Sequence, residues 1–179
     1  MIELEIDSIR VNLRNYQRVV ILREKNAERY LPIWIGPTEA DAIAYRLQDV
    51  SVARPQTHDL LSNMIEQLGA TVHSVVVNEM TNDIYFARIK LEQNGRSLEI
   101  DSRPSDAIAL AVRAQVPIYA NEAVLEKAGV RLDQEGQPLG KSVGPEIEPT
   151  SEANADELKK LSPFRDVIEG LDLEDFEKK

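Results

Sequence analysis

The chain of 179 residues contains no cysteine, which excludes a disulfide framework and a zinc site built on thiolates. It also contains no apolar run that approaches the ~20 residues a membrane-spanning helix needs. Acidic residues interrupt the first stretch, MIELEIDSIRV, where a signal peptide would be apolar. We therefore expect a cytoplasmic protein with no membrane segment.

Positive charge is scarce. Residues 1–130 hold 14 Lys and Arg against 18 Asp and Glu, and residues 131–179 hold 7 against 13. Nucleic-acid-binding proteins usually carry a basic excess, because neutralising phosphates drives their affinity. The composition by itself does not favour a nucleic-acid partner. Four arginines recur through the first predicted hairpin, where solvated strand charges are a better interpretation than a basic patch: Arg10, Arg14, Arg18 and Arg23.

Familiar catalytic motifs are missing as well. The sequence has no Gly-rich phosphate loop, no nucleophile elbow and no HExxH helix. A two-metal nuclease needs several acids converging on hard cations. The acids near predicted strand ends show no tight ligand spacing, so a metal site is not indicated: Glu39, Glu79, Asp83 and Asp101.

The most informative stretch present is 96–114, RSLEIDSRPSDAIALAVRA. Residues 97–101 alternate polar and apolar, which is typical of a half-buried strand. Pro104 then suits the first position of a helix, and the residue before a proline prefers extended geometry. The junction gathers several polar residues that could form a reactive or anion-binding corner: Asp101, Ser102, Arg103, Ser105 and Asp106.

A weaker copy of this stretch lies at 31–47, where Asp41-Ala42-Ile43-Ala44 corresponds to Asp106-Ala107-Ile108-Ala109. The order of predicted elements agrees on both sides of this match. We predict an α+β fold built from a duplicated unit, about 1–69 and 70–130, each with three mostly antiparallel strands and helices. The strands are expected at 2–13, 17–23, 30–35, 71–78, 84–92 and 96–101, and the helices at 39–48, 57–68, 104–114 and 121–128.

The chain changes character after residue 132. Residues 133–156 are rich in Gly, Pro and acids, which predicts a flexible linker. Residues 157–179 recover apolar residues at helical spacing, which predicts short helices that dock on the domain or on a partner. Residues 1–132 form the predicted domain.

A second polar cluster, RPQTHDL, opens the helix expected at 57–68, with Thr57 as its cap. His58 falls in the first turn, where the helix dipole disfavours a charged imidazole, so it could act as a general base. A surface histidine near a cap is the alternative that the sequence favours. Asp59 is equally explained as an acid at a helix start. Met64, on the apolar stripe of this helix, is expected in the core.

Two charged residues of the 101–106 junction allow two interpretations each. Asp106 is expected at the third helical position and Asp41 in the same place of the first unit, which favours capping of backbone N–H groups over catalysis. Arg103 has no counterpart in the first unit. A guanidinium beside a helix start suits a phosphate or carboxylate, and a salt bridge to an acid such as Asp101 is equally acceptable.

Four blocks together resemble the bifunctional nuclease domain family: LPIWIGPTEADAIA, RPQTHDLL, YFARIKL and DSRPSDAIALAVRAQVPIYANEAVLEKAG. The resemblance covers about 1–130, and DSRPSDAIALA is its most specific part. It implies cleavage of RNA and DNA, an activity associated with plant members. The family's characteristic blocks map onto Arg54, Pro55, Thr57, His58 and Asp59, and onto residues 101–106.

The resemblance makes a nuclease the first hypothesis for function. Arg54 and Arg103, helped by Ser102 and Ser105, would hold the scissile phosphate, and neutral His58 would activate water. Asp59 or Glu79 would orient the base or a divalent cation, Mg²⁺ or Mn²⁺. The hypothesis requires residues 54–59 and 101–106 to meet in space.

The alternative is a non-catalytic module that binds an anionic ligand or a protein. The acidic balance and the missing metal-ligand pattern support it. A homo-oligomer, most simply a dimer, is expected under either hypothesis, because strand edges of small sheets often pair.

Overall fold

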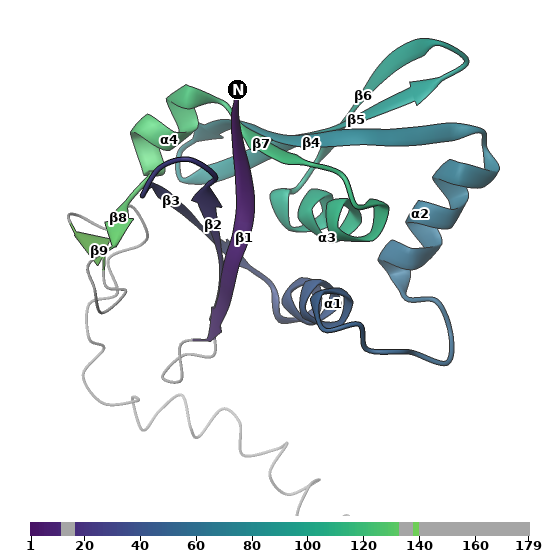
Figure 1. The fold of residues 1–179 in the computed structure, drawn as a ribbon, viewed down its shortest axis with the longest axis horizontal. Coiled ribbons are helices and arrows are strands. Elements are labelled where there is room, and N and C mark those ends of the chain that lie inside the picture. Colours follow the sequence, from purple (N-terminus) through teal and green to yellow (C-terminus); the bar gives the residue numbers. More distant parts are fainter. Residues whose placement is uncertain (12–16, 133–137, 140–179) are drawn as a thin grey trace, which may run out of the picture. The chain divides into compact units, whose positions relative to one another are not determined.

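The computed structural model describes residues 1–11, 17–132 and 138–139. The described residues form a mixed α+β fold with one seven-stranded sheet and four helices, and the predicted order of strands and helices is confirmed up to residue 128 (Figure 1). The strands are β1 (Ile2–Val11), β2 (Arg18–Glu24), β3 (Tyr30–Ile35), β4 (Ala70–Thr81), β5 (Ile84–Gln93), β6 (Arg96–Ser102), β7 (Ile118–Ala120), β8 (Arg131–Leu132) and β9 (Pro138–Leu139). The helices are α1 (Pro37–Leu47), α2 (Thr57–Gln67), α3 (Pro104–Ala114) and α4 (Glu122–Ala128).

The two halves of the chain share an arrangement. Three consecutive antiparallel strands lead into a helix in each half, β1-β2-β3-α1 and β4-β5-β6-α3. The short strand β7 joins the halves, because it pairs with β1 on one side and lies parallel to β4 on the other. The strand order is therefore β3-β2-β1-β7-β4-β5-β6. The origin of this arrangement by duplication stays a prediction.

The sheet curls so that strands far apart in its order approach each other. Tyr85 of β5 donates a hydrogen bond to the carbonyl oxygen of Pro32 in β3, at 3.2 Å, although four strands separate β5 from β3. Burial raises the pKa of Tyr85 to about 12, so its hydroxyl stays protonated and able to donate at neutral pH. We call this approach of β3 and β5 the seam.

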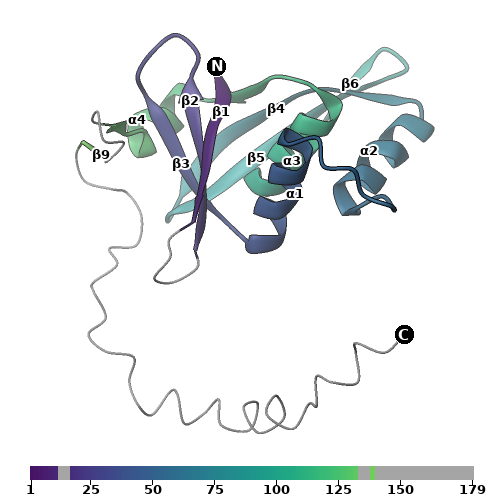
Figure 2. The ribbon, with the colours of Figure 1, turned by 60° about the horizontal axis from the view of Figure 1, so that its bottom comes forward.

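Three helices lie on one side of the sheet, and α3 is central among them. Figure 1 shows α1, α2 and α3 below β4 and to the right of β1, and Figure 2 shows α1 beside α3. Helix α3 packs against α1, α2, β4 and β5, and seven of its residues are buried. Small side chains allow this close approach: Ala107, Ala109 and Ala111 are each at most 1 % exposed. The core around α3 includes Leu22, Ile43, Val75, Ile108 and Leu125.

Residues with positive φ form two of the turns. Asn94 and Gly95, both with positive φ, form the two-residue turn between β5 and β6. Gly69, with φ +72°, follows the end of α2 in the left-handed conformation. Gly129 is different, because its φ is −69°. A Cβ atom there would lie 2.3 Å from the carbonyl oxygen of Leu125, so close backbone approach is what requires glycine.

Other local predictions are wrong. Gly36 and Gln56 occupy the N-cap positions of α1 and α2, where Thr38 and Thr57 were expected. Met64 is 53 % exposed rather than in the core. The side of α2 that packs on the core carries His58 and Ile65. Most of the other apolar residues of the helix, Met64 among them, lie on an exposed side, so helical spacing alone predicted the wrong environment for Met64.

The C-terminal predictions lie mostly outside the described residues. Strand β9 (Pro138–Leu139) lies within the linker predicted at 133–156 and pairs with β8, which precedes that linker. The rest of that segment and the helices expected at 157–179 are not described. Within the described residues, no helix is long and apolar enough to cross a membrane.

Candidate active site

The two polar clusters sit at helix starts. Arg103 is the N-cap of α3 and Pro104 its first residue, as the sequence predicts. Gln56 is the N-cap of α2, and its backbone N–H donates to the carboxylate of Asp59 at 2.7 Å. This capping box fixes the first turn of α2, so His58 projects from a rigid position.

The helix starts meet through His58 and Asp106. The Nε2 atom of His58 lies 3.0 Å from Oδ1 of Asp106, although 48 residues separate them in the sequence. His58 is only 7 % exposed, so the interpretation as a surface histidine is wrong. An ionised Asp106 accepts hydrogen bonds only, so it selects the tautomer with the proton on Nε2 and leaves Nδ1 as an acceptor.

Arg103 holds Asp106 from the other side. Its Nε donates to Oδ2 of Asp106 at 2.7 Å, and an Nη2 hydrogen bond of 2.8 Å reaches Glu39 of α1. These hydrogen bonds to Asp106 and Glu39 raise the pKa of Arg103. The salt-bridge interpretation is therefore confirmed with different partners, because Asp101 instead faces Arg88 at 3.9 Å. The chain Glu39–Arg103–Asp106–His58 connects α1, α3 and α2.

A second set of contacts between the helices centres on Arg113, in the last turn of α3. Its side chain is 6 % exposed, and its Nε donates to Asp59 at 2.5 Å. Other nitrogens of the same guanidinium donate to Gln56 Oε1 at 3.2 Å and to the carbonyl oxygens of Ala42 and Ala109. One buried guanidinium thereby ties the last turn of α3 to α1 and to the start of α2.

The pKa of Asp59 reflects this environment. Burial alone would raise it, but hydrogen bonds from the Gln56 backbone and from Arg113, with the charge of Arg113, outweigh burial and lower it from 3.8. Asp59 is thus an ionised structural partner of Arg113.

A pocket of about 400 Å³ opens beside His58. Its lining comes from the starts of α1 and α2 and includes Thr38, Asp41, Tyr45, Gln56 and Thr57. Pockets of a few hundred Å³ with convergent polar groups are typical ligand sites. We call this the imidazole pocket.

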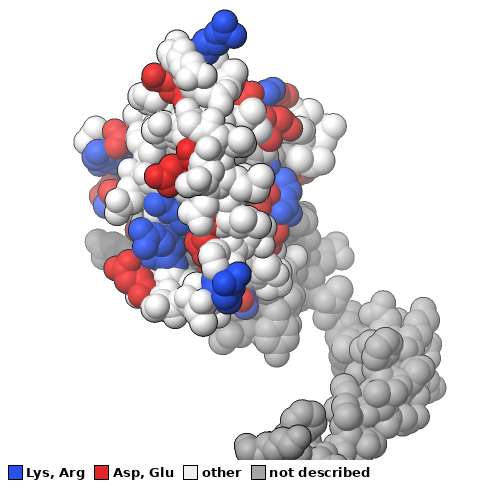
Figure 3. Space-filling model, turned by 90° about the vertical axis from the view of Figure 1, so that its right-hand side faces the viewer, with Lys and Arg blue, Asp and Glu red and all other residues white. Residues whose placement is uncertain are grey.

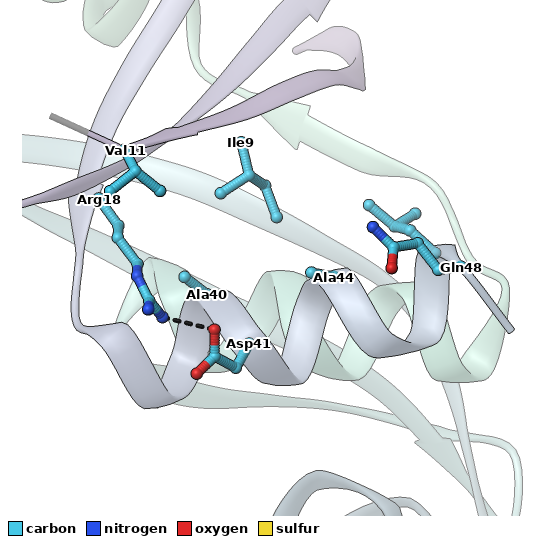
Figure 4. Close-up of a pocket in the computed structure, with 8 residues that line it drawn as sticks. Ile9, Val11, Arg18, Ala40, Asp41, Ala44 and Gln48 are labelled. Atoms are coloured by element: carbon cyan, nitrogen blue, oxygen red, sulfur yellow. Dashed lines mark hydrogen bonds and ion pairs between the residues drawn. The ribbon is translucent and has the colours of Figure 1, made fainter. Parts of the chain in front are cut away.

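Asp41 does not play the role of Asp106. It lies in the second turn of α1, where Arg18 of β2 donates to it at 2.5 Å (Figure 4). Neither helix has a side-chain cap, so the capping role predicted for Asp41 and Asp106 is wrong. Both carboxylates accept from arginine instead, because arginines supply stronger charged donors than the free backbone N–H groups.

Four other predicted site residues lie around this junction or away from it. Ser105 is buried at 7 % exposure in the first turn of α3, and the Ser102 hydroxyl donates to the carbonyl oxygen of Arg103 at 3.0 Å. Arg54 is exposed just before α2, and its side chain makes no ion pair with any described residue. Glu79 accepts from Thr81 in β4 and does not join the His58 cluster.

The described surface shows no large field of positive charge on the side that carries α2. Figure 3 shows acidic and basic side chains interspersed there, with uncharged ones between them. In the first hairpin, Arg18 and Arg23 each pair with an acid, Asp41 and Glu5. The described residues also contain no group of three or more His, Asp or Glu that could hold a metal ion.

Sequence reasoning missed Arg113 and the role of Glu39. Arg113 had a signal, since it is the single charged residue after Asp106 on an otherwise apolar helix. Such a cation is retained only with buried partners. Glu39 was considered only as a metal ligand, because nothing local in the sequence connects it to Arg103.

Comparisons with known proteins identify relatives of the chain. A family profile described as "Bifunctional nuclease domain" matches residues 20–133. An uncharacterized protein of Mycobacterium tuberculosis, Rv1829, is 37 % identical over 166 residues, which is 93 % of this chain and 94 % of that protein. Bifunctional nuclease 1 of Arabidopsis thaliana is 30 % identical over 122 residues, 66 % of this chain, and Bifunctional nuclease 1 of Oryza sativa subsp. japonica is 29 % identical over the same length. The chain spans little more than a third of these plant proteins, 38 % and 37 % of their lengths.

Proposed function

This chain belongs to the bifunctional nuclease domain family, and we propose that it hydrolyses phosphodiester bonds of DNA or RNA at the imidazole pocket. The observation that carries the proposal is the partly buried contact between His58 and Asp106 beside that pocket. The names of the plant relatives support the reaction class.

In the proposed reaction His58 is the general base. Asp106 accepts a hydrogen bond from Nε2–H, and Nδ1 takes a proton from a water molecule as its oxygen attacks phosphorus. The phosphorus–oxygen bond to the leaving group breaks, the leaving oxygen takes a proton from solvent, and the imidazolium returns its proton to solvent. Arg103 is a positioning residue, since it fixes the carboxylate that fixes the imidazole.

Arg54 is the better candidate for holding the phosphate. Its guanidinium is exposed and makes no ion pair with a described residue, whereas Arg103 already faces two carboxylates. A divalent cation remains our expectation for charge stabilisation, and no step is assigned to it here.

The test uses the full chain with end-labelled single-stranded DNA and RNA in Mg²⁺, Mn²⁺ and chelator. We expect His58→Ala to lower the cleavage rate about 100-fold or more, the range for loss of a general base. The matched control is His73→Ala, since His73 is the only other histidine and its side chain is 70 % exposed. Substrates left intact in all three conditions would contradict the proposal, and so would unchanged cleavage by His58→Ala.

A second function is favoured by one observation. Arg103 and Arg113 are already matched by carboxylates of other helices, which is typical of a network that holds helices together. The chain would then be a non-catalytic module that binds an anionic ligand or a protein. Ligand-dependent stabilisation without turnover would favour this function.

A homodimer is the assembly we propose under both functions. Strand β6 is an edge of the sheet, and its apolar residues Leu98 and Ile100 are 39 % and 47 % exposed. Such an edge can pair with a second copy. Light scattering of the full chain tests this, and a monomer would contradict it.

A further inference from the structure

A second pocket lies at the seam. It encloses about 300 Å³, the lower end of the range for ligand pockets, between the end of β3, the start of β5 and the start of α3. Its lining includes Trp34, Asp83, Ile84, Tyr85, Arg103 and Ser105. We call it the seam pocket.

The walls of the seam pocket are apolar and partly open. Trp34 is the only tryptophan of the chain and is 39 % exposed, and Ile84 is 60 % exposed. Large apolar side chains are exposed at a cost, so an indole and an isoleucine facing one pocket indicate a ligand with a flat apolar surface.

Polar groups lie at the edge of the same pocket. Ser105 lines the pocket, and its hydroxyl makes no hydrogen bond within the described residues while keeping access to solvent. Arg103 uses Nε and Nη2 for Asp106 and Glu39, and its Nη1 hydrogens are not used in the described contacts. A ligand could therefore accept from the guanidinium and exchange a hydrogen bond with the hydroxyl.

The charges around the seam pocket argue against a phosphate group as the ligand. Arg103 is matched by Asp106 and Glu39, and Asp83 adds a further carboxylate to the lining. An anion would meet a negative balance there. A neutral heteroaromatic ring, with an apolar face and hydrogen-bonding edges, meets no such repulsion.

We propose that the seam pocket receives one unpaired nucleobase of a single-stranded DNA or RNA substrate, with its face against Trp34. This inference rests on the proposed nuclease function for its place in the reaction. Arg103 lines the seam pocket and also holds the carboxylate that contacts His58, so a base seated there touches the residue that positions the proposed general base. A base inside a duplex cannot enter, because both of its faces are stacked.

The single tryptophan makes the test direct. The full chain carrying His58→Ala, which removes the proposed base, is titrated with a decathymidylate while the fluorescence of Trp34 is followed. We expect saturable quenching. An abasic oligomer of the same length and charge is expected to bind about tenfold more weakly or not at all, because one stacked base contributes that much. A blunt duplex is expected to leave the fluorescence unchanged.

Variants at two exposed apolar residues serve as probe and control. Ile84→Ser removes an apolar wall of the seam pocket and is expected to weaken decathymidylate binding about fivefold. Leu68→Ser changes a residue of comparable exposure, 68 %, after α2 and outside this pocket, and is expected to leave binding unchanged. Equal quenching by the abasic oligomer, no quenching by decathymidylate, or equal effects of both variants would each overturn the inference.

Cleavage by the unsubstituted chain separates the two proposals. Cleavage without quenching of Trp34 fluorescence would overturn the proposed nucleobase site and leave the proposed nuclease function standing. Saturable, base-dependent quenching without cleavage in any metal condition would keep the nucleobase site and overturn the hydrolytic function.

Discussion

Helices α1 and α3 carry the same tetrapeptide, Asp-Ala-Ile-Ala, after equivalent sets of strands, yet they occupy different environments. Helix α3 buries seven residues and α1 buries three. Asp106 contacts His58 of α2, whereas Asp41 contacts Arg18 of its own half and its side chain is 51 % exposed. The comparison teaches that the shared tetrapeptide forms a helix in both halves but does not determine what that helix contacts. The connection from β6 to β7 places α3, and not α1, centrally, against two other helices and strands β4 and β5.

The largest loss of stability is expected when Arg113, which anchors α3 and has no equivalent in α1, is replaced. Arg113→Ala is expected to lower the free energy of unfolding by about 2–4 kcal/mol, because it leaves the Asp59 carboxylate without its charged partner and the Ala42 carbonyl without its donor. Urea denaturation of the full chain measures this.

The control for Arg113 is Arg46→Ala in the last turn of α1. Arg46 is 40 % exposed and lies 3.7 Å from Asp49, so its loss should change stability by less than about 1 kcal/mol. Equal effects of both variants would show that the buried guanidinium does not anchor α3.

The equivalent alanines of the two helices provide the next test. Ala109 is fully buried, so Ala109→Leu should destabilise the fold by about 1–3 kcal/mol through overpacking. Ala44 lines a pocket of about 310 Å³ between α1 and β1, shown in Figure 4, so Ala44→Leu should be nearly neutral. A thermal melt of each variant is sufficient, and the reverse order would contradict the placement of α3 at the centre.

The equivalent aspartates should differ by a smaller amount in stability. Asp106→Asn weakens charge-assisted hydrogen bonds to His58 and Arg103 and should cost about 1–2 kcal/mol, while Asp41→Asn should cost less than about 1 kcal/mol. Cleavage sharpens the comparison, since Asp106 contacts His58 and Asp41 only lines the pocket, so Asp106→Asn should slow cleavage more than Asp41→Asn. Slower cleavage by Asp41→Asn alone would move the reaction away from the His58–Asp106 pair.

The smallest effect expected is a pH dependence from Asp59. The folded state lowers the pKa of Asp59 below 3.8, so this group stabilises the fold above its unfolded pKa, and that stability is lost as the pH falls through the folded pKa. Asp59→Asn should flatten the stability profile below about pH 4. Unfolding followed between pH 2 and 5 tests this, with Asp49→Asn, whose side chain is 88 % exposed, as the control.

Much of the fold was predictable because its signals are local. Residues 104–114 were predicted as a helix and match α3 residue for residue, since Pro104 and the run of alanines act within a few positions. The meeting of residues 54–59 with 101–106 was also anticipated, and the His58–Asp106 contact confirms it. Their catalytic roles stay predictions.

Other features were not predictable, because they depend on which side of an element is covered. Met64 and Ile65 are neighbours with the same apolar character, and only the packing of α2 decides that Ile65 faces the core. Glu39 and Arg103 are 64 residues apart, and no pattern joins them.

The sequence by itself determined the order of strands and helices, the starts of α3 and of the hairpin turns, and the resemblance to a nuclease family. Those features follow from backbone preferences and side-chain periodicity, which act over a few residues. Only the tertiary structure decided that Arg113 is a buried anchor, that Trp34 and Ile84 face one pocket, and that Asp106 rather than Asp41 holds a histidine. The reason is that burial and charge pairing depend on the curling of the sheet and the crossover of α3, which bring together residues that the chain keeps apart.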